Sequence, residues 1–120
     1  MNPNLLKQFE NPPSGLRGAP FWAWNCKLDR EMLLWQIDRL AEMGMGGFPI
    51  HSRTGLDTPY LGAEFMEMVR SCVEKAKANG MKAYLYDEDR WPSGFGGGLV
   101  TREERFRSRY LVFAPADYRQ

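Results

Sequence analysis

The feature that most restricts the fold is a regular alternation of short apolar runs with longer amphipathic segments. The runs at 19–24, 46–51 and 81–86 predict strands, and the segments at 29–43 and 62–79 between them predict helices. Strands that alternate with helices through short turns form a parallel sheet with right-handed crossovers. The sequence therefore predicts an α/β fold with three parallel strands and two crossover helices.

Single residues mark the expected ends of these elements. Asp29 can cap the first helix with its carboxylate, and Gly44 and Gly80 stand where each helix must stop in a left-handed conformation. Pro49 lies inside the second strand and has no N–H for a sheet ladder. We therefore expect this strand to bulge at Pro49 or to end early.

The chain divides into three parts on these patterns. Residues 1–17 are rich in Asn and Pro and predict an irregular lead-in, residues 18–100 form the α/β segment, and residues 101–120 begin a following segment. A glycine-rich loop follows the third strand. Thr101–Glu104 has the spacing of a capping box, which predicts a short helix, and Tyr110–Phe113 predicts a further strand.

Composition excludes several classes of protein. The 120 residues are 43% hydrophobic and 13% aromatic, with a net charge of +1, so the chain is neither disordered nor basic enough to hold nucleic acid or a membrane surface. It shows no signal peptide and no apolar run long enough to span a membrane, which favours a cytoplasmic location. Cys26 and Cys72 fit neither a zinc nor a CxxC spacing, and we expect two reduced, buried thiols rather than a disulfide.

Polar and aromatic side chains gather where the predicted strands end. In parallel α/β folds the carboxyl ends of strands and the loops after them carry the functional groups. The helix-to-strand turns at the opposite edge carry no reactive side chains. The strand-end residues are Trp24-Asn25, His51-Ser52-Arg53 and Asp87-Glu88-Asp89-Arg90-Trp91.

Each of these candidates also has a structural interpretation. We expect Trp22 and Trp24 on opposite sides of the first strand, with one of them in the core. A lone histidine such as His51 is commonly a hydrogen-bonded structural residue, although Arg53 beside it favours binding. The three acids at 87–89 repel one another, so a cation, an arginine or substrate hydroxyls should compensate them, unless they form a solvated turn.

The remaining motifs give little support to cofactor chemistry. The acids could hold calcium or magnesium, but one cluster without a spaced partner set does not predict a metal site. The glycines lack the GK[ST] ending of a phosphate-binding loop, and no GxSxG, HExxH or serine–histidine–acid pattern is present. Aromatic platforms, carboxylates and an arginine on one face are what sugar recognition needs. We therefore expect a carbohydrate ligand and no cofactor.

Three segments carry a resemblance to a known family. PFWAWN, MGMGGFPIHSRTGLDTPYLG and AYLYDEDRWPSGFGGG resemble the opening of bacterial (β/α)8-barrel glycoside hydrolases, similar to the α-L-rhamnosidases of glycoside hydrolase family 106. The resemblance covers residues 12–113, and DEDRWPSG is its most specific element. It implies a partial TIM-type barrel whose inserted β-rich segment begins at YLVF. It also implies a substrate-binding end lined by Trp24, Asn25, His51, Arg53, Asp87, Glu88, Asp89 and Trp91.

The length of the chain limits what this resemblance implies about catalysis. A complete barrel takes about 250 residues, and a glycosidase needs two carboxylates across the scissile bond. Asp87 and Glu88 are the catalytic candidates among the residues present. We therefore expect an N-terminal fragment of a glycoside hydrolase that is inactive alone. The alternatives are a non-catalytic carbohydrate-binding α/β module, or a small α/β protein that self-associates through the uncovered edge of its sheet.

Overall fold

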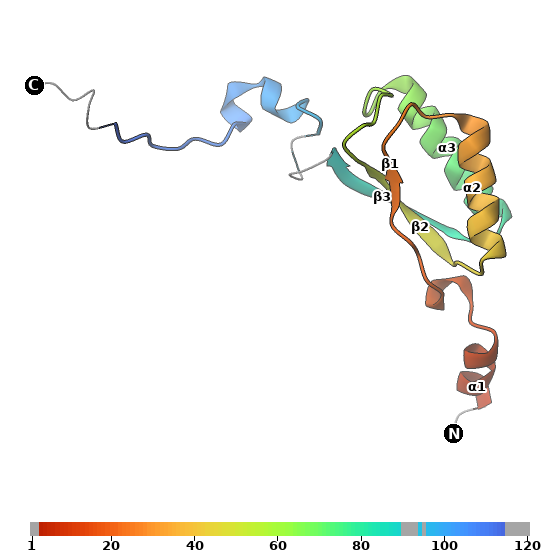
Figure 1. The fold of residues 1–120 in the computed structure, drawn as a ribbon. Helices are drawn as coiled ribbons and strands as arrows, with labels where there is room; N and C mark the ends of the chain where they lie inside the picture. The colour runs from red at the N-terminus through yellow and green to blue at the C-terminus, as the bar shows by residue number, and fades with distance from the viewer. Residues whose placement is uncertain (1–2, 90–93, 95, 115–120) are drawn as a thin grey trace, which may run out of the picture.

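The described chain contains one parallel sheet, and helices connect its consecutive strands (Figure 1). The computed structural model describes residues 3–89, 94 and 96–114. In chain order the helices and strands are α1 (Pro3–Glu10), β1 (Trp22–Trp24), α2 (Arg30–Glu42), β2 (Gly47–Ser52), α3 (Ala63–Ala78) and β3 (Lys82–Asp89). The strands pair in parallel in the order β1-β2-β3, so α2 and α3 are crossover helices. The predicted α/β class is confirmed as an open three-stranded sheet.

The signals expected at the helix ends are present. The carboxylate of Asp29 accepts the backbone N–H of Met32 at 2.8 Å, which satisfies one of the free donors of the first turn of α2. Gly44 and Gly80 follow the two helices with φ of +81° and +65°, a conformation that costs glycine nothing. Local sequence therefore sets where both crossover helices begin and end.

The register between β2 and β3 changes near the carboxyl end of the sheet. Regular pairing ends at Ile50↔Leu85 and resumes at Ser52↔Asp89, so one residue of β2 faces three of β3. The bulge or early strand end expected at Pro49 is therefore wrong, because the irregularity lies between Ile50 and Ser52. β1 joins the ladder only at Ile50, which leaves Pro49 with a strand on one side alone, a position that a proline tolerates.

The hydrophobic core lies between the sheet and the two crossover helices. Trp24 packs edge-on against Trp22 and Phe65, with ring centroids 5.6 and 5.4 Å apart, and Trp22 packs against Phe48 at 5.0 Å. The expectation that the two tryptophans lie on opposite sides of β1 is wrong, because residues two apart in a strand share a face. The buried apolar side chains are Trp24, Leu28, Leu33, Ile37, Phe48, Ile50, Phe65, Val69, Cys72, Ala76 and Met81.

Both ends of the chain differ from the sequence prediction. Residues 3–10 form α1 where an irregular lead-in was expected. Thr101–Glu104 does not start an α-helix: two 3-10 turns, Val100–Arg102 and Glu104–Phe106, stand there without side-chain caps. Tyr110–Phe113 forms no strand, and its side chains are 70–95% exposed in a segment that leads away from the sheet (Figure 1).

Two further expectations can be compared with the folded chain. The cysteines are free, as expected, but only Cys72 is buried, while Cys26 is exposed in the loop after β1. Among the described helices the longest, α3, has 16 residues, and none combines the length and apolar character needed to cross a bilayer.

Candidate functional site

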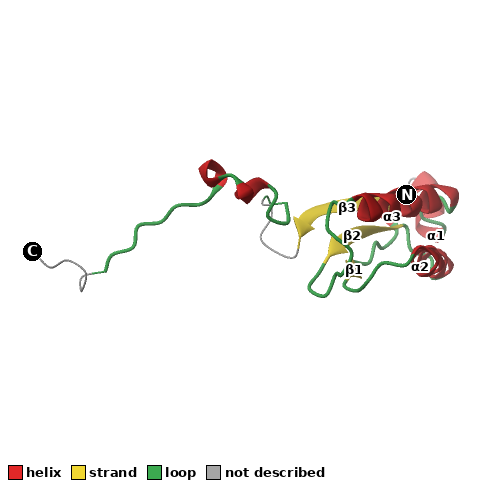
Figure 2. Cartoon of the chain, turned by 90° about the horizontal axis from the view of Figure 1, so that it is seen from above, coloured by secondary structure: helices red, strands yellow, loops and turns green. Residues whose placement is uncertain are grey.

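Within the described residues, one face of the sheet carries no helix, because α2 and α3 both lie on the other side (Figure 2). The side chains that alternate away from the core form an open face, made up of Phe21, Pro49, His51, Tyr84, Tyr86 and Glu88. The residues Phe21, Tyr84 and Tyr86 are 55%, 48% and 37% exposed. Large aromatic rings at the surface of a sheet provide stacking platforms for a ligand.

His51 and Glu88 form the buried centre of the open face. The imidazole is 1% exposed, and its Nε2 lies 3.6 Å from Oε2 of Glu88. The rings of Phe21 and Tyr86 flank it, with centroids 4.5 and 4.4 Å away. Within the part of the chain that the structure describes, neither ring nitrogen of His51 has a hydrogen-bond partner. A buried imidazole in this condition has unused hydrogen-bonding capacity.

Tyr86 and Arg53 complete the polar surroundings of Glu88. The negative charge of Glu88 raises the pKa of Tyr86 above its ordinary value, helped by burial and by the hydrogen bond between the two side chains; the guanidinium of Arg53 opposes the shift. The phenol therefore stays protonated and donates its hydrogen to the carboxylate. Arg53 is exposed and follows β2 directly, at the rim of the open face.

A second polar group lies around Asp89. The pKa of Tyr60 is raised by burial and then by the negative charges of Asp89 and Asp87. Gly97 packs so closely here that a Cβ atom would stand 2.9 Å from the Tyr60 ring and 3.1 Å from the Asp89 carboxylate. The acids at 87–89 are the last three residues of β3. The alternative expectation of a solvated turn is wrong for Glu88 and Asp89, because these residues are only 5% and 3% exposed.

The other sequence candidates lie in different places. Trp24 is 2% exposed on the helix side of β1, so it belongs to the core and does not reach the open face. Asn25 is exposed in the loop after β1, and a Cβ atom at Gly55 would stand 2.6 Å from its backbone oxygen. Asp87 is exposed on β3. Trp91 lies outside the described residues.

The segments after β1 and β2 are held together by hydrogen bonds from backbone N–H groups. The N–H of Arg53 donates to Trp24 O at 3.0 Å, and the N–H of Leu28 donates to the hydroxyl of Thr58 at 3.0 Å. Thr58 is 1% exposed, so this contact is shielded from water. The rim of the site is therefore held by contacts between the two loops.

Sequence reasoning missed Phe21, Tyr60 and Tyr86. The period of two in a strand was the available signal, because it places Tyr86 on the same face as Glu88. No comparable signal identifies Tyr60, which comes to the acids through the long loop between β2 and α3.

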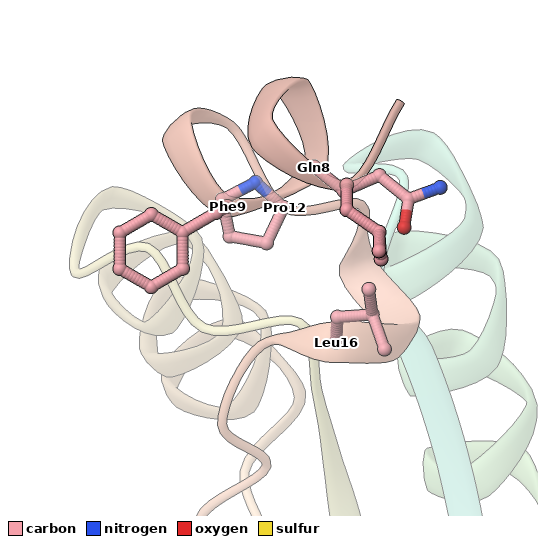
Figure 3. Close-up of a pocket in the computed structure, with 5 residues that line it drawn as sticks. Gln8, Phe9, Pro12 and Leu16 are labelled. Atoms are coloured by element: carbon pink, nitrogen blue, oxygen red, sulfur yellow. The ribbon is translucent and has the colours of Figure 1, made fainter. Parts of the chain in front are cut away.

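A surface hollow in the lead-in is remote from these groups. It measures about 410 Å³ and is lined by Leu5, Gln8, Phe9, Pro12 and Leu16 (Figure 3). The lead-in that forms it joins the amino end of β2, where the N–H of Gly46 donates to Gly18 O. Among the described residues no group of three His, Cys, Asp or Glu side chains could hold a metal ion.

Comparisons with known proteins give no family for the chain. No protein-family model matches the sequence, and no curated protein matches it either.

Proposed function

We propose that this chain forms the carbohydrate-binding face of a (β/α)8-barrel glycoside hydrolase and that it does not hydrolyse glycosides alone. The observation that carries the proposal is His51: it is buried at the carboxyl end of the central strand, both ring nitrogens lack partners among the described residues, and aromatic rings and the Glu88 carboxylate surround it. The family resemblance of the sequence supplies the reaction class.

The chemistry of the open face suits a sugar. A sugar ring has an apolar C–H face that stacks on exposed rings such as Phe21 and Tyr84, and hydroxyls that both donate and accept hydrogen bonds. The imidazole of His51, one nitrogen donating and one accepting when neutral, matches a hydroxyl in either role. Arg53 at the rim adds donors for further ligand oxygens.

The placement of the acids supports the absence of hydrolysis by this chain alone. Glycosidases place two carboxyl groups about 5–9.5 Å apart across the scissile bond. Asp87 and Glu88 are neighbours on β3, so their side chains point to opposite sides of the strand. Of the two candidates, only Glu88 belongs to the open face, where it would position a sugar hydroxyl together with Tyr86 and His51.

Calorimetric titration of the purified chain with a panel of neutral mono- and oligosaccharides tests the binding half of the proposal. We expect saturable binding to at least one sugar, and about tenfold weaker binding by Phe21→Ala, because the variant loses a stacking ring. Trp35→Ala is the matched control, since Trp35 is 55% exposed on α2, away from the open face. Saturable binding that is weakened equally by both variants would place the ligand elsewhere, and no binding at all would refute the proposal.

Turnover of aryl glycosides tests the other half. We expect the 120-residue chain to release no aryl alcohol from any of them. Turnover that Glu88→Gln abolishes would show that the chain is a complete catalyst and that Glu88 is a catalytic residue. The variant Trp91→Ala, measured in the binding assay, tests the role of the tryptophan that lies outside the described residues.

A further inference from the structure

A tight turn in the glycine-rich segment after β3 packs against the end of that strand. The N–H of Leu99 donates to Gly96 O at 3.1 Å. Between them, Gly97 and Gly98 have φ of +63° and +89°. Two successive positive φ values between hydrogen-bonded ends are typical of a type I′ turn, which favours glycine at both positions. We call residues 96–99 the glycine turn.

Gly97 is the residue through which the glycine turn contacts the sheet. A Cβ atom there would stand 2.9 Å from the Tyr60 ring and 3.1 Å from the Asp89 carboxylate. A Cβ atom at Gly98 would meet nothing within 4 Å. The two neighbours of Gly97 have little room to move, because the Tyr60 ring packs on Phe65 with centroids 5.2 Å apart and Asp89 is 3% exposed. The glycine turn can therefore dock here only without a side chain at position 97.

The described ladder holds the end of β3 to β2 by a single pair. After Ile50↔Leu85 the pairing is interrupted, and it resumes only at Ser52↔Asp89. Glu88 lies within the interruption, directly before the residue on which the glycine turn docks. A contact that fixes the place of Asp89 therefore also fixes the backbone that carries Glu88.

We propose that Gly97 is a positioning residue for Glu88 and acts through the docked glycine turn. The same contact joins the glycine turn to the segment between β2 and α3, which contains Tyr60 and is itself bonded to the segment after β1. The segments after all three strands thus form one continuous rim, and a rim that is ordered before a ligand arrives lowers the entropic cost of binding.

The inference rests on the proposed function in treating His51 and Glu88 as the binding centre. It leaves the outer edge of β3 for the next strand of the proposed barrel. Its first tests use no sugar, so they do not depend on whether a sugar binds.

Two alanine variants separate the docking from the backbone conformation. Gly97→Ala and Gly98→Ala both put a Cβ atom on a residue with positive φ, but only the first drives that atom into the sheet. His51 is the one histidine of the sequence, so its ring-proton resonance in an NMR spectrum reports the surroundings of the His51–Glu88 pair directly. We expect this resonance to shift in Gly97→Ala and to keep its parent position in Gly98→Ala.

The titration of Tyr60 gives a second readout. Burial is the main cause that raises the pKa of this phenol, and the charges of Asp89 and Asp87 add to it. Displacing the glycine turn exposes the phenol to water, so its pKa should fall in Gly97→Ala and stay at the parent value in Gly98→Ala. The Tyr60 ring resonance is assigned by its absence from Tyr60→Phe, and circular dichroism confirms that the variants fold.

The parent chain provides a test that needs no variant. NOE cross-peaks should join the α protons of Gly97 to the Tyr60 ring, and their absence would overturn the proposal. A His51 resonance that is unchanged in Gly97→Ala, or that shifts equally in both alanine variants, would overturn it as well.

Calorimetric titration with a sugar that binds the parent measures the consequence for the site. We expect about tenfold weaker binding by Gly97→Ala and unchanged binding by Gly98→Ala. Unchanged affinity in Gly97→Ala would contradict the positioning role. A parent chain that binds no sugar would refute the proposed function, while the resonances of His51 and Tyr60 would still decide whether Gly97 positions Glu88.

Discussion

The hydrogen bond between Leu28 and Thr58 allows a stability prediction with a local readout. The N–H of Leu28 donates to the Thr58 hydroxyl at 3.0 Å, and both residues are buried, at 5% and 1% exposure. Thr58→Val keeps the shape of the side chain and removes the acceptor. Leaving a buried N–H unpaired costs about 1–3 kcal/mol. For a domain of 60–100 residues each kcal/mol lowers Tm by about 4–8 °C, so we expect a fall of roughly 5–20 °C.

The assay combines thermal unfolding with amide hydrogen exchange by NMR. Thr58→Ser is the control, since it keeps the hydroxyl and loses only a methyl group, which costs about 0.8 kcal/mol. Both variants should unfold earlier, but only Thr58→Val should expose the Leu28 amide to faster exchange. An unchanged exchange rate at Leu28 in Thr58→Val would refute the reasoning, because the destabilisation would then come from packing alone.

Two further predictions concern titratable groups. Burial raises the pKa of the Cys72 thiol to about 12, so we expect an aromatic disulfide reagent to label one thiol, Cys26, in the native chain and both after denaturation; two native equivalents would contradict the burial of Cys72. The pKa values of Tyr60 and Tyr86 are both raised, with Asp87 contributing to each, so their stabilising effect is complete below the ordinary tyrosine pKa and is lost as pH rises through the folded-state values. Asp87→Asn should move the late part of the tyrosinate absorbance titration to lower pH, and an unchanged curve would exclude the charge effect.

The three strands and the two crossover helices could be predicted from the sequence, because the residues that define them act locally. Hydrophobic periodicity gave the strand and helix positions, and Asp29 and Gly44 act within one helical turn of the ends they define. The helix at 3–10 also had a local signal that composition obscured, since Pro3 takes the first helical position, where proline is favoured.

The remaining features could not be predicted from local sequence, because they depend on which distant segments of the chain pack or pair with each other. Tyr110–Phe113 has the composition of a strand, but a strand exists only with a ladder partner, and none pairs with it in the described chain. The acids at 87–89 resemble a loop in sequence, yet they extend β3 because Asp89 regains pairing with Ser52. Tyr60 reaches the acids through tertiary folding, which no local pattern encodes.

The shift in register between β2 and β3 has a consequence for how this strand can vary in length. The excess in β3 is two residues, a full period of strand alternation, so Glu88 stays on the face of His51 and Asp89 stays on the opposite face near Tyr60. Removing one residue would exchange the two carboxylates between the open face and the helix side. The end of β3 should therefore tolerate insertions or deletions of two residues, whereas a change of one residue would separate Glu88 from His51.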